Sequence, residues 1–153
     1  MSAPAYPLTI YYDASCPLCA TELQTLCEYA GEQRLRLVDC SVPGFADAAA
    51  AAAGLDSTEL MRTIYARDAN GRWLGGIDVF VPAYDAAGVA AVARLYSHPR
   101  LRPLWDRVYP WIARHRMALS RLGLHRAFGW LVRRTARRAE QRRVGCSRRD
   151  CRS

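Results

Sequence analysis

The chain has 153 residues, of which 51% are hydrophobic, and this composition suits one packed domain and excludes wholesale disorder. Its six cysteines are too few and too irregularly spaced for a disulfide-stapled miniprotein. We find no run of about 18 apolar residues and no secretory leader pattern, so we expect no transmembrane segment and a reducing cytoplasm as the compartment.

The net charge of +8 hides two halves of opposite sign. Residues 1–93 contain 5 arginines and 11 acidic residues, whereas residues 94–153 contain 17 arginines and 3 acidic residues. One interpretation of this excess is a solvated, arginine-rich helical face. The alternative is that the basic half docks on an anionic lipid surface, a nucleic acid or an acidic protein.

Apolar runs between turn residues predict a β-α-β unit at the start of the chain. Residues 8–12 have the composition of a buried strand, without an internal Gly or Pro. A helix is expected over 17–29, because Pro17 suits a first turn and Gly31 suits a helix end. Residues 35–39 predict a second strand.

A helical crossover and a hairpin are expected next. The composition predicts an alanine-rich helix over 48–53 and a short capped turn over 56–59. Residues 62–67 and 72–74 predict two strands, and the Asp-Ala-Asn-Gly sequence at 68–71 is a strong turn signal between them.

The remainder of the chain is expected to be helical. Gly76 precedes a helix whose first piece Pro82 should limit to its opening turn, and residues 88–96 predict a further helix. Apolar residues at helical spacing predict helices over 101–122 and 124–143.

The resulting order, β-α-β-α-β-β-α with C-terminal helices, predicts an α/β fold with a thioredoxin-like core. In such a core a mixed four-stranded sheet joins a parallel half to an antiparallel hairpin. We expect residues 1–96 to form this redox core and 97–144 to form a helical, arginine-rich elaboration packed on it. Residues 145–153 are expected to form a cysteine-containing tail.

Cys16 and Cys19 carry the chemistry that the sequence predicts most clearly. They form a C-x-x-C pair directly after a strand and at the start of a helix. Unpaired N–H groups and the positive end of the helix dipole favour a thiolate there, so Cys16 is the expected nucleophile. Cys19 lies one turn deeper on the same side of the helix, where it can resolve a mixed disulfide by attacking Cys16.

Asp13 ends the first strand, three residues before Cys16. One interpretation is a partly buried carboxylate that relays protons to or from the thiols. The other is a turn residue that accepts hydrogen bonds from the backbone of its own loop. The two roles are compatible.

The other cysteines have several interpretations. Zinc binding by the C-x-x-C pair needs two further ligands, and Cys146 and Cys151 form the second close cysteine pair of the chain. For that pair, a second redox site, a metal clip and ordinary tail thiols all stay open. Cys27 and Cys40 are expected to be small, buried, apolar residues.

The pattern Asp13-x-x-Cys16-x-x-Cys19 after an apolar strand resembles the signature of the DCC family of predicted thiol–disulfide oxidoreductases. The segments 76–80 (Gly-Ile-Asp-Val-Phe) and 109–116 (Tyr-Pro-Trp-Ile-Ala-Arg-His-Arg) are similar to the same family. The resemblance implies a thioredoxin-like fold and a redox role for Cys16 and Cys19, with Asp13 as an accompanying polar residue.

Two positions depart from the expected pattern. Ala14 stands where a glycine is usual after the aspartate, so its turn must either avoid positive φ or accept strain. Thioredoxins place a proline before their third strand, and Met61-Arg62 occupies that region here.

The sequence therefore predicts a thiol–disulfide oxidoreductase that acts by dithiol–disulfide exchange. It requires no bound cofactor, takes a protein or small-molecule disulfide as substrate and is reduced by an external thiol. The alternatives are a binding module whose arginine-rich helices dock on an anionic partner, and a structural zinc protein.

Overall fold

A mixed four-stranded sheet forms the centre of the fold in the computed structural model, which describes residues 4–123, 126, 129–138 and 141. The strands β1 (Leu8–Tyr12), β2 (Leu35–Asp39), β3 (Tyr65–Arg67) and β4 (Trp73–Gly75) lie in the spatial order β2-β1-β3-β4. β1 is parallel to β2, whereas β3 is antiparallel to both β1 and β4. The sheet is thus half βαβ unit and half hairpin.

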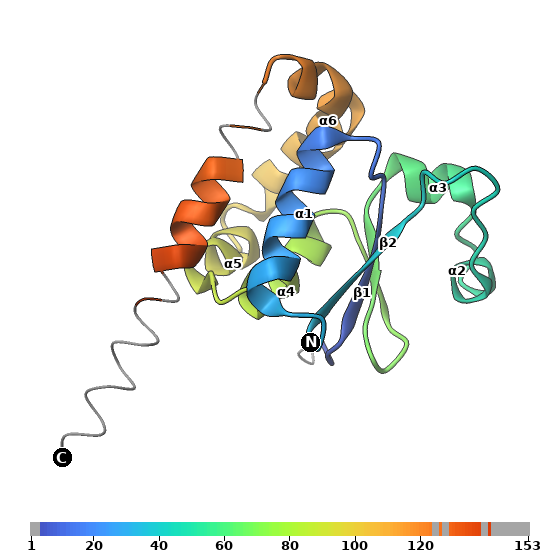
Figure 1. The fold of residues 1–153 in the computed structure, drawn as a ribbon, viewed down its shortest axis with the longest axis horizontal. Helices are drawn as coiled ribbons and strands as arrows, with labels where there is room; N and C mark the ends of the chain where they lie inside the picture. Colours follow the sequence, from blue (N-terminus) through green and yellow to red (C-terminus); the bar gives the residue numbers. More distant parts are fainter. Residues whose placement is uncertain (1–3, 124–125, 127–128, 139–140, 142–153) are drawn as a thin grey trace.

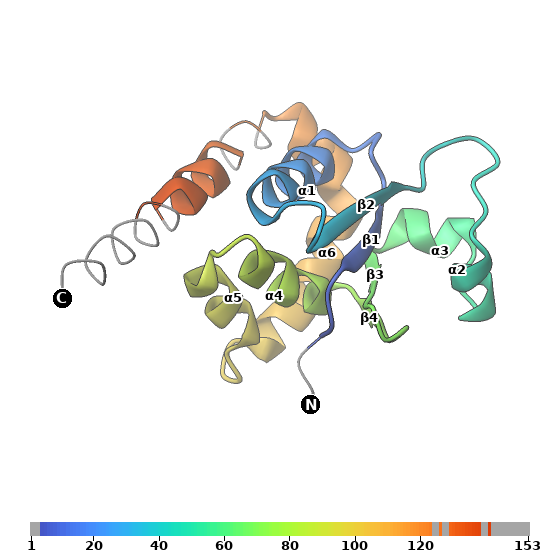
Figure 2. The same cartoon turned by 60° about the horizontal axis from the view of Figure 1, so that its bottom comes forward.

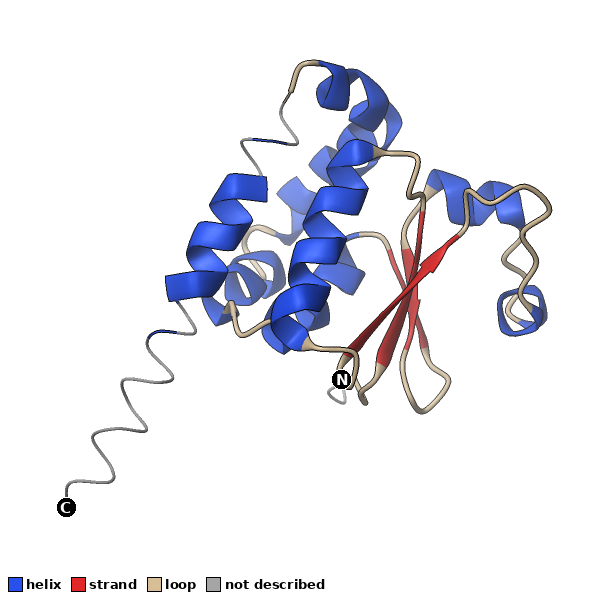
Figure 3. Cartoon of the chain, in the orientation of Figure 1, coloured by secondary structure: helices blue, strands red, loops and turns tan. Residues whose placement is uncertain are grey.

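Helices cover both faces of the sheet (Figures 1 and 3). On one side lie α1 (Pro17–Ala30), α4 (Ile77–Ala86), α5 (Ala90–Ser97) and α6 (Arg102–Arg121). On the other side lie the short helices α2 (Ala48–Ala52) and α3 (Ser57–Arg62). The larger helical layer holds the main core.

The alternation of β1 divides the apolar residues between two cores. Leu8 and Ile10 are fully buried in the main core with Leu26 of α1. Tyr11 points to the opposite face and packs in a smaller core with Leu60 of α3. Because both faces of β1 are buried, Thr9 is its one residue with an aliphatic hydroxyl and the others are apolar or aromatic. This burial fixes the position of Tyr12, from which the loop leads into α1.

The predicted architecture is confirmed, since the mixed sheet and the intervening helices are consistent with a thioredoxin-like fold. One strand boundary was wrong. The strand predicted over 62–67 begins only at Tyr65, because the Asp56 carboxylate accepts a hydrogen bond from Glu59 N at 2.8 Å and caps a helix that continues to Arg62.

The expectation that Pro82 stops a helix after one turn was also wrong. α4 runs through Pro82 to Ala86. A proline removes one backbone donor, and this cost is outweighed here because Val79, Ala83 and Tyr84 of the same helix are at most 1% exposed in the main core.

α6 packs against α1, α4 and α5, as the second view shows (Figure 2). Beyond it, residues 129–138 are helical and bury Val132 and Ala136 in the main core, while four arginines of this segment face solvent: Arg133, Arg134, Arg137 and Arg138. The rest of the helix predicted over 124–143, and the tail 145–153, lie outside the described residues. The predicted domain boundary after residue 96 stays a prediction.

Candidate active site

Cys16 and Cys19 lie at the start of α1, after the loop that follows β1, and both are free thiols. Cys16 is the N-cap residue of α1, with extended backbone angles, and Pro17 occupies the first turn. The Cys16 carbonyl accepts the first helical hydrogen bond, from Ala20 N at 2.9 Å. The sequence prediction of a C-x-x-C pair at a helix N-terminus is therefore confirmed.

The loop before Cys16 is held by two carboxylates at the ends of the parallel strands. Asp39, opposite Tyr12 in the register, accepts hydrogen bonds from Ala14 N at 3.2 Å and from Ser41 N at 2.8 Å. Bonds from the Ser41 hydroxyl, Ser41 N and Ala14 N keep the pKa of Asp39 below its ordinary value. In the described part of the chain no residue other than glycine has positive φ, so the turn at Ala14 avoids it.

Asp13 takes part in the loop and also reaches across to α6. Its Oδ1 accepts a hydrogen bond from Ser15 N at 2.9 Å, which confirms its predicted role as a turn residue. Its Oδ2 accepts one from Arg116 Nη2 at 2.7 Å, and the Asp13 side chain is only 4% exposed. The proton-relay role stays a prediction.

The surroundings of Cys16 favour its thiolate. A hydrogen bond from the Cys19 thiol lowers the pKa of Cys16 most strongly. The Cys19 backbone N–H, the Ser120 hydroxyl and the positive charge of Arg116 also lower it, and together these effects outweigh desolvation to bring this pKa to about 5. Cys16 is therefore expected to be ionised at neutral pH.

The opposite holds for Cys19. Its hydrogen bond to Cys16, its burial and the negative charges of Cys16 and Glu22 raise its pKa above the ordinary value of a thiol. A thiolate at Cys16 with a protonated thiol at Cys19 is the state that a nucleophile and a resolving residue require.

Two residues of α6 complete the site, and neither was predicted from the sequence. Ser120 Oγ lies 3.9 Å from Cys16 Sγ and accepts a hydrogen bond from Leu18 N at 3.2 Å. The Cys16 side chain makes no capping hydrogen bond, so Ser120 provides the acceptor for this amide of the first helical turn. Arg116 bridges the Asp13 carboxylate and the carbonyl of Met61, in the region where thioredoxins place their proline. Arg116 does belong to the segment 109–116 on which the family resemblance partly rested.

Replacing Arg116 by glutamine is expected to raise the pKa of Cys16, because a positive charge near the thiolate is lost. Alkylation of Cys16 by iodoacetamide near pH 5 should become roughly two- to threefold slower. Arg114→Gln, an exposed position on the same helix, is the matched control. Identical pH profiles of alkylation in the two variants would show that Arg116 does not act on the thiol.

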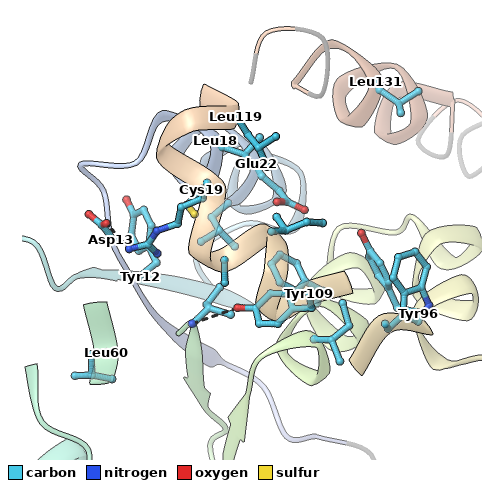
Figure 4. A pocket seen from close by; sticks show the side chains of 18 residues that line it. Tyr12, Asp13, Leu18, Cys19, Glu22, Leu60, Tyr96, Tyr109, Leu119 and Leu131 are labelled. Carbon is cyan, nitrogen blue, oxygen red and sulfur yellow. Dashed lines mark hydrogen bonds and ion pairs between the residues drawn. The ribbon is translucent and has the colours of Figure 1, made fainter. Parts of the chain in front are cut away.

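A cavity of about 430 Å³ opens beside the thiols (Figure 4). Cys19 lines it and is partly exposed, whereas Cys16 is 0% exposed and does not line it. Most of the wall is apolar, with rings from α4, α5 and α6 at one end and the Asp13–Arg116 pair at another. The site thus combines a redox-type thiol pair with a hydrophobic pocket.

Glu22 is a buried carboxyl group on the wall of this cavity, one turn after Cys19. Tyr84 Oη donates a hydrogen bond to its Oε1 at 2.7 Å. Desolvation raises the pKa of Glu22 to about 7, against the opposing effect of Tyr84. Glu22 was not predicted as a site residue, although its place four residues after Leu18 and four before Leu26, on one face of the helix, was a signal.

Of the remaining cysteines, the structure describes Cys27 and Cys40. Cys40 is 3% exposed in the smaller core, where burial raises its pKa to about 11, and this confirms its predicted apolar role. Cys27 is only partly buried and its Sγ donates to the Leu35 carbonyl at 3.4 Å. Among the described residues no three His, Cys, Asp or Glu side chains are placed to hold a metal ion; Cys146 and Cys151 lie outside them.

A C-x-x-C pair at the start of the first helix, beside a mixed four-stranded sheet, defines a thioredoxin-like dithiol protein. Residues 10–122 match the family of DCC1-like thiol-disulfide oxidoreductases, and the chain belongs to that family. The resemblance noted from the sequence is thereby confirmed. No curated protein and no solved structure matches the chain. Among the described residues, no helix is long and apolar enough to cross a membrane.

Proposed function

We propose that this family member exchanges thiols and disulfides with Cys16 as the nucleophile and Cys19 as the resolving thiol. The observation that carries the proposal is the place of the pair: Cys16 is the N-cap residue of α1 and Cys19 lies in its first turn. There a hydrogen bond from the Cys19 thiol is the largest of the effects that lower the pKa of Cys16 to about 5. A thiolate at this position supplies the attacking group without a bound cofactor.

The exchange transfers two electrons. The Cys16 thiolate attacks one sulfur of the substrate disulfide, and the other sulfur leaves as a thiolate that takes up a proton. Cys19 then loses its proton and attacks Cys16 Sγ, which releases the second substrate thiol and leaves a Cys16–Cys19 disulfide. An external thiol returns the two electrons and restores the dithiol.

Asp13 and Arg116 position the thiols in this scheme. Asp13 orders the loop through Ser15 and holds Arg116, whose charge lowers the pKa of both cysteines. We assign Asp13 to this positioning role, and its service as a proton relay stays a prediction.

Attack by Cys16 requires a local movement, because this residue is 0% exposed in the dithiol state. Ser120 Oγ of α6 lies 3.9 Å from Cys16 Sγ, and of the two thiols only that of Cys19 lines the cavity. We therefore propose that the Cys16 side chain or the last turn of α6 shifts when a substrate binds.

The compartment and the reductant are part of the same proposal. We propose a reducing compartment, the cytoplasm, whose low-molecular-weight or protein thiols would restore the dithiol. An anionic partner for the exposed arginines of residues 129–138 stays a prediction.

The Cys19→Ser variant tests the proposal. Without a resolving thiol, the mixed disulfide between Cys16 and the substrate should accumulate at about one equivalent per chain, and peptide mass analysis should place it on Cys16. Cys27→Ser, which leaves both active thiols, should show no such accumulation. Adducts found only on Cys27 or Cys40 in the Cys19→Ser variant would refute the assignment of the nucleophile.

A further inference from the structure

We propose that the cavity beside Cys19 is a binding site for low-molecular-weight, uncharged disulfides that carry an aromatic or branched aliphatic group. The inference rests on the proposed function, because it names the substrate class for the same thiol pair. Four features of the structure carry it: the place of the cavity, its lining, its size and its charge.

The place of the cavity restricts how a substrate reaches the thiols. Cys19 is partly exposed on the cavity wall, while Cys16 is 0% exposed, does not line the cavity and has its Sγ 3.9 Å from Ser120 Oγ. A thiol pair recessed in this way is reached more readily by a small molecule that enters the cavity than by a disulfide on the surface of a folded protein. The cavity side is therefore the approach that the structure favours, and the local movement proposed above would bring Cys16 to a disulfide held beside Cys19.

The lining selects apolar groups. Phe80, Tyr96, Trp105 and Tyr109 form a connected set of rings, with centroid distances of 6.1 Å between Phe80 and Tyr109 and 5.0 Å between Tyr96 and Trp105. Aliphatic side chains of α1 and α6 complete the wall beside Cys19, as Figure 4 shows for Leu18 and Leu119. A polar group buried against these side chains would lose its hydration and find few hydrogen-bond partners in return.

The size of the cavity fits a small molecule. Its volume of about 430 Å³ falls in the range of roughly 300–1,000 Å³ that small-molecule sites occupy. The walls come from regular helices rather than from long loops, since α1, α4, α5 and α6 all contribute side chains. Such walls hold their shape, so the site is already formed before the substrate arrives.

The charges around the cavity disfavour anionic substrates, while its apolar lining disfavours charged groups of either sign. Glu22, whose pKa burial raises to about 7, is partly ionised near neutrality and repels carboxylate-bearing disulfides from the wall. Arg116, the cation that lines the cavity, is already paired with Asp13 at 2.7 Å. A neutral, apolar disulfide is not repelled by the Glu22 carboxylate, and it loses little hydration when it enters the cavity.

The test compares second-order rate constants of the reduced protein with dibenzyl disulfide, hydroxyethyl disulfide and glutathione disulfide. Each is divided by the rate constant for free dithiothreitol, which removes differences in intrinsic reactivity. We expect the benzyl compound to be favoured over the other two by at least about tenfold, because an apolar pocket distinguishes substrates that differ by even one methylene group by roughly 10- to 200-fold.

A substitution that fills the cavity should remove this preference. Ala113 lines the cavity, so Ala113→Phe should bring the ratio between dibenzyl and hydroxyethyl disulfide close to one. Ala118→Phe, at an exposed position of the same helix, should keep the wild-type ratio. If Ala113→Phe does not fold, the same site can be tested on the wild type by calorimetry. The ligand is then the hydrocarbon analogue of dibenzyl disulfide, in which two methylene groups replace the sulfurs.

The outcomes separate the two proposals. Absence of exchange with all three disulfides would overturn the proposed function. Exchange at equal relative rates, together with no binding of the hydrocarbon analogue, would overturn the cavity inference and leave the function intact. Preference for the benzyl compound that Ala113→Phe removes and Ala118→Phe retains would support both.

Discussion

Replacing Cys16 by serine is expected to lower the rate of disulfide reduction at least about 100-fold, because a serine hydroxyl is not ionised at neutral pH and cannot take part in disulfide exchange. The loss should be larger than for any other single cysteine, since Cys16 is the thiol with a pKa of about 5. The measurement is the second-order rate of reduction of a small disulfide by the fully reduced protein.

Cys40→Ser is the matched control for this experiment. It removes the same atom from the chain, but the Cys40 thiol lies in the smaller core and burial raises its pKa to about 11. We expect its rate to stay within about twofold of the wild type. A fast Cys16→Ser variant beside a slow Cys40→Ser variant would mean that the nucleophile lies elsewhere.

The second large effect concerns stability and comes from Glu22. This carboxyl is buried, and its pKa of about 7 in the folded state exceeds the ordinary value near 4.5 that applies to the unfolded chain. The folded state therefore holds the proton more tightly. Stability falls as pH rises from about 4.5 to about 7 and then levels off, because above that range both states are ionised.

Glu22→Gln removes this titration and keeps an acceptor for Tyr84. We expect the variant to match the wild type in unfolding free energy near pH 4.5, and to exceed it by about 3 kcal/mol at pH 8. Urea unfolding at both pH values measures the difference directly. The difference between the unfolding free energies of variant and wild type cancels the titration of groups common to both. The variant also lacks the negative charge that Glu22 places near Cys19, and the pH dependence of Cys19 alkylation measures the resulting change in the pKa of that thiol.

Glu28→Gln is the control, because Glu28 is an exposed residue of the same helix. Its unfolding free energy should differ from wild type by no more than about 0.5 kcal/mol at either pH. A gain at pH 8 that is equally large in both variants would mean that helix charge, rather than burial of Glu22, sets the effect.

Local signals in the sequence sufficed for the elements that present the thiols. The uninterrupted apolar run of β1, Pro17 at the start of α1 and Gly31 at its end act within a few residues, and the structure reproduces all three. The C-x-x-C spacing determines that both thiols share one side of a helix N-terminus. Fold class and family could therefore be predicted from the sequence.

Local signals failed where packing decided the outcome. Pro82 lies inside α4 because burial of its neighbours outweighs the missing hydrogen bond, and a local rule has no access to that burial. Similarly, the short capped turn predicted over 56–59 is the start of α3, which continues to Arg62, so β3 begins only at Tyr65.

The sequence by itself determined the thiol pair, the strand and helix that present it, and thereby the class of chemistry. Only the tertiary structure decided which groups surround that pair. Arg116 and Ser120 lie about a hundred residues away and reach Cys16 because α6 packs on α1. The buried state of Glu22 and the apolar cavity likewise arise from four helices meeting, and such long-range contacts depend on the whole core rather than on any local pattern.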